Sequence, residues 1–100
     1  TESDFAVTIE ELLTLFGWRW IHSRPARTLD GWRTALSGAP GWPDYFCVQS
    51  GKIVVIELKS DDGELEPEQY FWLCDLVEAG LDCYLFQPKD EIEMMVEVLR

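Results

Sequence analysis

The sequence has 100 residues, of which 47% are hydrophobic and 13% aromatic. This length fits one hydrophobic core, and the apolar content is too high for an intrinsically disordered chain. No apolar run reaches the roughly 18 residues needed to cross a bilayer, so we expect one soluble, intracellular domain spanning residues 1–100. The cysteines, Cys47, Cys74 and Cys83, are odd in number and widely spaced. They argue against a disulfide framework or a zinc site and favour small buried side chains.

Acidic side chains outnumber basic ones by 19 to 8, which gives a formal net charge of -11. A nucleic-acid-binding protein normally takes its affinity for phosphate from Lys and Arg, so this balance argues against that class. The basic residues are unevenly distributed, because four of them share a stretch in which Asp30 is the only acid: Arg19, Arg24, Arg27 and Arg33. A locally basic loop on an acidic protein is compatible with weak, salt-sensitive binding to nucleic acid.

The first predicted element is an amphipathic helix that ends at Gly17. Its apolar side chains recur at helical spacing: Phe5, Ile9, Leu12 and Phe16. Residues 18–22 are bulky and β-branched, which predicts a strand. Residues 23–42 have no sustained period and are punctuated by Gly and Pro, so we predict a long loop. Loops of this length are uncommon inside compact domains and tend to be functional.

The second half of the chain predicts a hairpin, a helix, a strand and a final helix. Residues 45–48 and 53–58 read as two strands joined by a tight turn at Ser50-Gly51. A helix opens at Pro67 with Tyr70, Leu73, Cys74 and Val77 on one stripe, and it closes at Gly80. A short strand over residues 81–86 and a helix up to Leu99 follow. The order αβββαβα predicts an α+β fold with a central mixed sheet flanked by helices.

Two carboxylates and an ammonium group are expected to meet at one end of the hairpin. Alternation along a strand sends Glu57 and Lys59 to the same side and Leu58 to the other. Pairing through the turn brings the end of the second strand beside the start of the first, and so brings Glu57 near Asp44. Hard cations such as Mg²⁺ or Mn²⁺ take oxygen ligands of this kind. Lys59 could then orient or help to deprotonate an attacking water.

The pattern Gly41-x-Pro43-Asp44, then Glu57-x-Lys59, then Gln69 resembles the PD-(D/E)XK nucleases, and most closely their VRR-NUC branch. The resemblance extends over nearly the whole chain and is closest to the small stand-alone form of phages and bacteria. It implies a restriction-endonuclease-like αβββαβ core with an added C-terminal helix. It also implies hydrolysis of DNA phosphodiester bonds that depends on Mg²⁺ or Mn²⁺, with no small-molecule cofactor, in the cytoplasm of a bacterial cell. Small stand-alone members resemble dimeric enzymes that act on branched DNA such as Holliday junctions or flaps, so the resemblance further implies a homodimer and a branched substrate.

Carried over residue by residue, the resemblance places the metal-binding carboxylates on Asp44 and Glu57 and the catalytic lysine on Lys59. The backbone carbonyl of Leu58 is the expected further ligand. These positions match the family's motif directly. They define the expected catalytic centre.

Two further positions are assigned by the resemblance with alternatives left open. The family often places a glutamate of its first helix near the metal; Glu2 is the first candidate here, with Glu10 and Glu11 behind it. Gln69 is expected to contact a catalytic group or a substrate phosphate, and a helix-capping role is equally compatible with its position. Many relatives carry a Gln in the first helix where this chain has Ala6, which removes support for an auxiliary role there.

Several loop residues are candidates for contacting nucleic acid. Arg24, Arg27 and Arg33 are expected to hold phosphates, because they are the local exception to the acidic surface; the alternative is that they only make the loop soluble. His22 is more simply a hydrogen-bonded strand histidine, with substrate contact as the alternative. Trp32 is a candidate for stacking on an unpaired base or filling a dimer contact. Trp42 is likewise a candidate for base stacking or a dimer contact. The remaining tryptophans are expected in the core: Trp18, Trp20 and Trp72.

The acidic composition keeps a rival hypothesis open. The chain could be a catalytically silent binding protein with a nuclease fold, or an acidic nucleic-acid mimic that occupies a basic partner. The net charge of -11 favours this rival. The intact set of Asp44, Glu57 and Lys59 favours the enzyme, because a mimic does not need these residues. Cleavage by the wild type that Lys59→Ala lacks would separate the two hypotheses.

Overall fold

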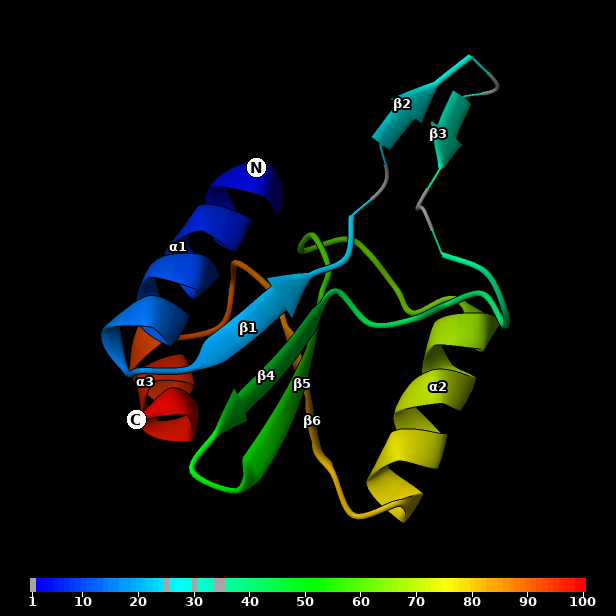
Figure 1. The fold of residues 1–100 in the computed structure, drawn as a ribbon. Helices are drawn as coiled ribbons and strands as arrows, with labels where there is room; N and C mark the ends of the chain where they lie inside the picture. The colour runs from blue at the N-terminus through cyan, green and yellow to red at the C-terminus, as the bar shows by residue number, and fades with distance from the viewer. Residues whose placement is uncertain (1, 25, 30, 34–35) are drawn as a thin grey trace.

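A computed structural model describes residues 2–24, 26–29, 31–33 and 36–100, with backbone alone at positions 2, 26–28, 32 and 33 (Figure 1). The main elements are helix α1 (Glu2–Leu15), strands β1 (Arg19–His22), β4 (Tyr45–Gln49) and β5 (Lys52–Leu58), helix α2 (Pro67–Glu78), strand β6 (Asp82–Phe86) and helix α3 (Ile92–Leu99). The predicted α+β class, with an αβββαβ core and a C-terminal helix, is confirmed. Within the described chain, no helix has both the length and the hydrophobicity that crossing a membrane requires.

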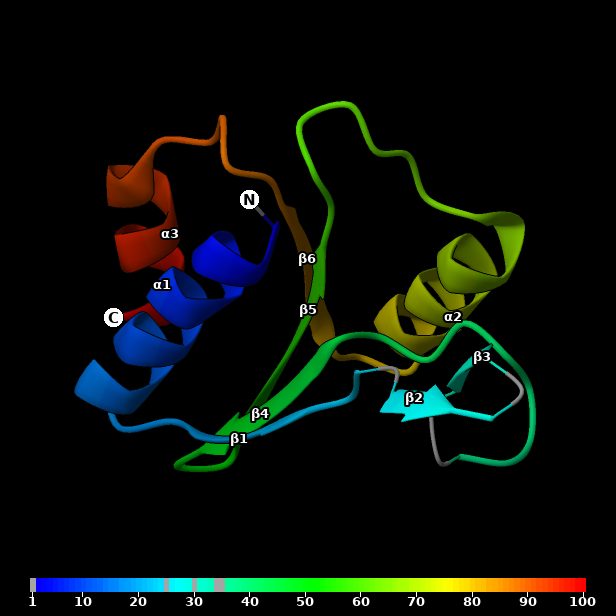
Figure 2. The same cartoon turned by 90° about the horizontal axis from the view of Figure 1, so that it is seen from above.

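The four main strands form a mixed sheet in the order β1-β4-β5-β6. The strand β4 pairs antiparallel with β1 on one side and with β5 on the other, whereas β6 runs parallel to β5 because α2 provides the crossover between them. The predicted hairpin turn is confirmed: Ser50 and Gly51 both have positive φ, at 48° and 81°, as a tight two-residue turn requires. Seen from above, α1 and α3 cover one face of the sheet and α2 lies on the other (Figure 2).

The hydrophobic core lies between the sheet and the pair formed by α1 and α3. Its buried side chains are Phe5, Ile9, Leu13, Trp18, Tyr45, Cys47, Val54, Ile56, Leu58, Phe86, Met95 and Leu99. The indole of Trp18 also donates a 2.7 Å hydrogen bond to the carbonyl of Leu99, which ties the end of α3 to the start of β1. Cys47 is buried as predicted, and burial raises the pKa of its thiol to about 12. Cys74 is exposed, so the prediction of burial was wrong for this cysteine.

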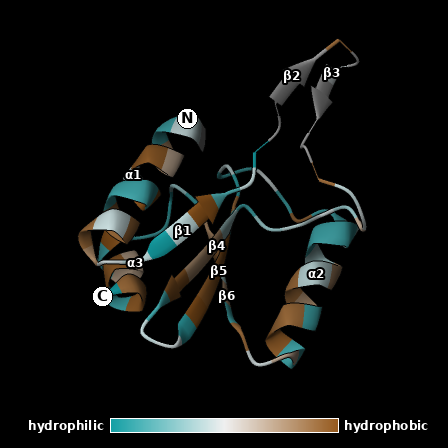
Figure 3. Cartoon of the chain, viewed as in Figure 1, coloured by the Kyte–Doolittle hydropathy of each residue, from teal (hydrophilic) through white to brown (hydrophobic). Residues whose placement is uncertain are grey.

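The face of the sheet that carries α2 is much less covered. In the described chain no residue of α2 is buried, although the helix has the predicted apolar stripe. On that stripe Tyr70 and Val77 are 55% and 56% exposed. Figure 3 shows hydrophobic residues in brown along α2 and along the strands of the sheet. Helical spacing predicts a stripe, but it does not tell whether the same chain covers it.

One prediction about the long loop was wrong. Within residues 23–42 the structure has two short strands, β2 (Ala26–Thr28) and β3 (Gly31–Arg33), which pair antiparallel in a sheet of their own. They project from the main body (Figure 1). Strands of three residues are too short to show an alternating apolar pattern, so the sequence did not reveal this pair.

Candidate active site

The β4–β5 hairpin sets Asp44 and Glu57 side by side. Tyr45 pairs with Ile56, so one further step in the same register puts Asp44 opposite Glu57. The backbone N–H of Leu58 donates a 2.7 Å hydrogen bond to Oδ2 of Asp44, which fixes the carboxylate at this end of the hairpin. The β4–β5 ladder itself ends at Tyr45 and Ile56, so Asp44 and Glu57 lie one step beyond its last pair, where carboxylates from adjacent strands can share one cation.

Glu57 is the buried member of this pair. It is 2% exposed, and it is the only charged side chain buried in the part of the chain that the structure describes. Its strand neighbours Ile56 and Leu58 belong to the core under α1 and α3, so alternation directs Glu57 to the opposite face of the sheet. Burying a carboxylate is costly unless opposite charge or hydrogen bonds compensate it. A divalent cation shared with Asp44 is one form that such compensation can take.

Lys59 follows on the same side of the strand. Its backbone N–H donates a 3.1 Å hydrogen bond to the carbonyl of Phe86, which continues the β5–β6 pairing one residue beyond the end of β5. Strand geometry therefore persists to Lys59, and a spacing of two residues gives its side chain the same direction as that of Glu57. The predicted common side of Glu57 and Lys59 is therefore consistent with the backbone at the end of β5.

The donor set suits a hard cation that keeps part of its hydration shell. Among the described residues, no group of three or more His, Cys, Asp or Glu side chains is arranged to hold a metal ion. Mg²⁺ is usually bound through only one or two carboxylates, with waters and substrate phosphates as the remaining ligands. Asp44 and Glu57 fit that pattern, and the backbone carbonyl of Leu58 remains the predicted additional oxygen. A structural zinc site would need four protein ligands.

A second carboxylate network lies on the α1 side of Asp44. Oε2 of Glu10 accepts a 2.6 Å hydrogen bond from the Tyr45 hydroxyl and lies 3.0 Å from Nδ1 of His22. The rings of His22 and Tyr45 are stacked, with centroids 4.2 Å apart. Burial, followed by the hydrogen bond to Glu10, raises the pKa of Tyr45 above its usual value. His22 is thus a hydrogen-bonded strand histidine, and it also faces a cavity of about 540 Å³ that Glu10, Arg24 and Asp44 line with it.

This geometry bears on the choice of a carboxylate from the first helix. The side chain of Glu2, the first candidate, lies outside the described residues. Glu10 shares a cavity with Asp44, whereas Glu11 is exposed and is not among the residues that line this cavity. Of the two described candidates, Glu10 is the one close to the predicted metal site. The sequence ranked it behind Glu2, since helical spacing alone cannot say which turn of α1 reaches the sheet.

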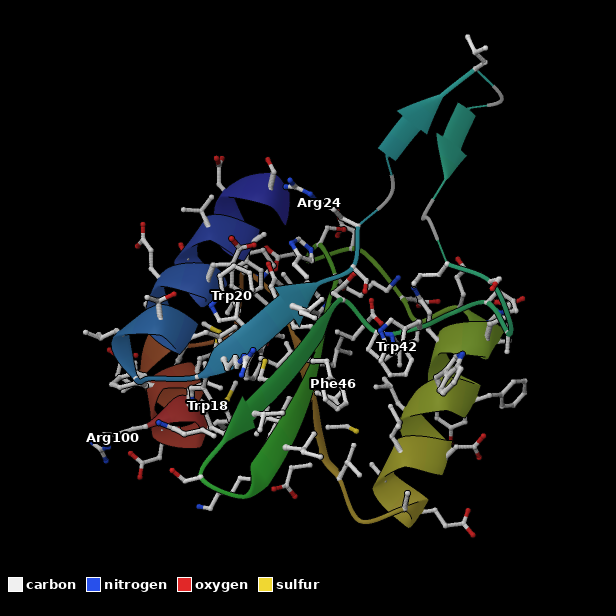
Figure 4. All side chains as sticks on the ribbon, in the orientation of Figure 1. Trp18, Trp20, Arg24, Trp42, Phe46 and Arg100 are labelled. Carbon is white, nitrogen blue, oxygen red and sulfur yellow. The ribbon has the colours of Figure 1, made fainter. Side chains whose placement is uncertain are left out.

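The predicted phosphate-binding residues are only partly described. Arg24 is exposed at the end of β1, at the border of the cavity shared with Asp44 (Figure 4). Arg27 lies on β2, and Trp32 and Arg33 lie on β3, but the side chains of all three are outside the described residues. Their roles in nucleic-acid binding stay predictions.

Gln69 takes part in capping and also faces the site. Its Oε1 accepts a 2.8 Å hydrogen bond from the backbone N–H of Glu66, one half of a capping box at the start of α2. It also lines a cavity of about 700 Å³ together with Asp44. Both predicted roles are therefore compatible with its position. The carboxamide oxygen is engaged at the helix start, so the amide nitrogen is the atom left to meet a substrate.

The structure adds a feature to the site that the sequence did not predict as a unit. Trp42 packs edge-on against Trp72 of α2, with ring centroids 5.0 Å apart and planes at 89°, and it stacks at 6.0 Å on Phe46. The Trp72 indole donates a 3.3 Å hydrogen bond to the carbonyl of Ala39. Trp72 was expected in the core but is only half-buried. Its place one helical turn after Gln69 was the available signal that it shares the face turned to Asp44.

Neither the known protein-family models nor the curated proteins that were searched match this chain. The functional conclusion therefore depends on the geometry around Asp44 and on the motif resemblance. The structure provides two carboxylates on adjacent segments at one end of the hairpin, a lysine two residues after one of them, and an aromatic cavity that Asp44 also lines. This combination is suited to metal-assisted hydrolysis of a phosphate ester.

We expect Gly41→Ala to destabilise the loop at the site. Gly41 has φ of +95°, and a Cβ placed there would lie 2.6 Å from the backbone carbon of Glu68, so the loop would have to move away from α2. Gly38→Ala is the matched control, because φ is +109° there and nothing lies within 4 Å of the added Cβ. Both changes cost backbone strain of about 1–3 kcal/mol. Gly41→Ala should cost at least about 1 kcal/mol more because of the clash, measured by urea unfolding. Equal losses would contradict the close packing of loop and helix.

Proposed function

We propose that this chain is a Mg²⁺- or Mn²⁺-dependent endonuclease of the PD-(D/E)XK type, of the VRR-NUC branch, that hydrolyses DNA phosphodiester bonds. The observation that carries the proposal is the hydrogen bond from Leu58 to Asp44, which holds this carboxylate opposite the buried Glu57 and next to the strand that delivers Lys59. The resemblance to small phage and bacterial nucleases supports the further proposal that it acts in the cytoplasm, that of the bacterial host if the chain is phage-encoded.

The residues of the site divide the chemistry among them. Asp44 and Glu57 would hold the cation, which supplies charge stabilisation for the phosphate and lowers the pKa of a bound water. Lys59 orients the attacking water and offsets negative charge that develops on the phosphate oxygens. Arg24, exposed at the border of the neighbouring cavity, holds an adjacent phosphate.

The direct test is cleavage of labelled linear, flap and four-way-junction DNA in Mg²⁺, Mn²⁺ or EDTA. Metal-dependent cutting of branched DNA in preference to linear DNA is expected. The Lys59→Ala protein is purified in parallel as a control, because any cleavage that persists in its preparation at the wild-type rate would come from a contaminating nuclease. The rival, a silent binding protein or acidic mimic, is favoured by the net charge of -11. Inactivity on every substrate together with tight binding to a basic partner would replace the nuclease proposal by this rival.

We also propose that the enzyme is a homodimer. A two-fold interface brings the same surface patch of both copies together. An apolar patch can pack against its own copy, whereas a patch of one charge repels its own copy. The surface formed by α2 and the edge strand β6 has this character: Tyr70, Leu73, Val77 and Leu85 line an apolar hollow of about 430 Å³ there. A second copy that covers it would bury the stripe that α2 leaves exposed.

For this interface we expect Val77→Arg to convert a dimer into a monomer. The substitution puts a charge into the centre of the patch, where pairing of two copies would desolvate it. Analytical ultracentrifugation measures the mass of each species. Leu15→Arg is the control, because Leu15 is 73% exposed on α1, away from the patch. A wild type that is monomeric at high concentration, or a Val77→Arg protein that remains dimeric, would contradict the proposed interface.

A further inference from the structure

The cavity of about 700 Å³ beside Asp44 is larger than catalysis by two carboxylates and a lysine requires. It is lined by loop residues 36–42, by Gln69 and Trp72 of α2, and by Ser23 where β1 ends. Ser23 donates a 2.8 Å backbone hydrogen bond to the carbonyl of Asp44, so the cavity wall is tied directly to the residue that would hold the metal. A group bound in this cavity would lie beside Asp44.

The wall of the cavity is a braced aromatic surface. Trp42 is backed by Phe46 and crossed at 89° by Trp72, and the Trp72 indole is bonded to the loop through Ala39. These contacts place Trp42 between the sheet and α2 (Figure 4). Gly41 allows the loop to approach this close, because any larger residue would meet the backbone of Glu68. Rings fixed in this way offer a stacking surface at little cost in side-chain entropy.

A few polar side chains lie beside the aromatic wall of the cavity. Ser23, Ser37 and Gln69 are the uncharged polar side chains among the lining residues, and the carboxamide oxygen of Gln69 accepts a hydrogen bond from Glu66. Flat heterocycles with hydrogen-bonding edges suit a cavity that has aromatic faces and a few donors and acceptors. A phosphate does not suit it, because no Lys or Arg is among the residues that line the cavity in the described chain.

From these observations we propose that the cavity binds one unpaired nucleobase of the strand that is cut, adjacent to the scissile phosphate. The inference rests on the proposed nuclease function and narrows its substrate to DNA that can offer an unstacked nucleotide at that position. Duplex ends, flaps and junction centres release such a base more easily than an intact duplex, because unstacking costs least where pairing is already interrupted. Preference for branched DNA then follows from the site itself.

The test is binding of a labelled flap in which a single abasic nucleotide is placed at successive positions around the branch. The branch fixes the register, and anisotropy in Ca²⁺ and in EDTA measures affinity separately from Mg²⁺-dependent cleavage. One position should weaken binding by roughly tenfold when its base is removed. Trp42→Leu should weaken binding of the intact flap by a similar factor and abolish the difference between intact and abasic flaps. Trp20→Leu, a half-buried tryptophan bonded to Thr14 on the α1 side, should keep that difference.

The outcomes separate the two proposals. Wild-type protein that binds intact and abasic flaps alike at every position, or that binds neither, overturns the base pocket even if it cuts DNA. A Trp42→Leu protein that keeps the full difference overturns it as well. Conversely, a base-dependent loss of affinity without cleavage in any metal supports the pocket and removes the nuclease function.

Discussion

Asp44→Asn is expected to lower metal-dependent DNA cleavage by at least about a hundredfold while leaving the fold intact. Asparagine keeps an oxygen that can accept the hydrogen bond from the backbone N–H of Leu58, so the end of the hairpin is retained. It removes a negative charge that would help to hold a hard cation beside Glu57. Lewis-acid stabilisation by such a cation would contribute several kcal/mol to the transition state, about tenfold in rate for each 1.4 kcal/mol. Initial cleavage rates over a range of Mn²⁺ concentrations measure the effect.

Two comparisons make this prediction specific to the site. Asp62→Asn makes the same chemical change at an exposed turn after β5 and should leave the rate within about a factor of two. Unfolding of Asp44→Asn should lie within about 1 kcal/mol of the wild type, because a hydrogen bond to a neutral acceptor replaces one to a charged acceptor. If the Asp44→Asn protein cleaves DNA at the wild-type rate at every metal concentration, Asp44 is not part of the catalytic centre.

The fold was predictable from local signals, because those signals determine the elements directly. The turn at Ser50-Gly51 sets the hairpin register, and the strand period of two then decides that Glu57 and Lys59 share a side while Leu58 enters the core. The position of Asp44 opposite Glu57 follows from the same register. The geometric part of the candidate site was therefore accessible from the sequence.

The contacts of the site between segments far apart in the chain could not be predicted from the sequence. Trp72 joins Trp42 because a loop and a helix far apart in the chain pack together, and no local period encodes that contact. The same limit applies to Glu10, whose bond to Tyr45 depends on where α1 crosses the sheet. Residues 26–33 lacked a sustained apolar pattern, because strands of three residues are too short to show one. The exposed stripe of α2, with Val77, shows that periodicity predicts an apolar face without predicting its partner.

Lys59→Ala is expected to reduce cleavage by about 10²–10⁴-fold, the range that a positioned acid–base group contributes. The side chain shares a direction with Glu57, and the backbone bond to Phe86 holds its strand in place, so removal of the ammonium group leaves the carboxylate pair where it is. Single-turnover cleavage of a flap substrate at saturating Mg²⁺ measures the chemical step.

Lys59→Arg distinguishes the two tasks assigned to the ammonium group. Arginine keeps the positive charge but is not deprotonated in proteins, so it can offset charge on the phosphate and cannot accept a proton from water. Recovery to within about tenfold of the wild type would assign Lys59 to charge stabilisation, whereas a loss as deep as that of Lys59→Ala would assign it to proton transfer. Lys52→Ala is the matched control, since Lys52 is an exposed lysine at the opposite end of the same strand. Equal losses of activity in the two lysine-to-alanine variants would mean that the effect comes from net charge, because Lys52 lies at the far end of β5 from Glu57.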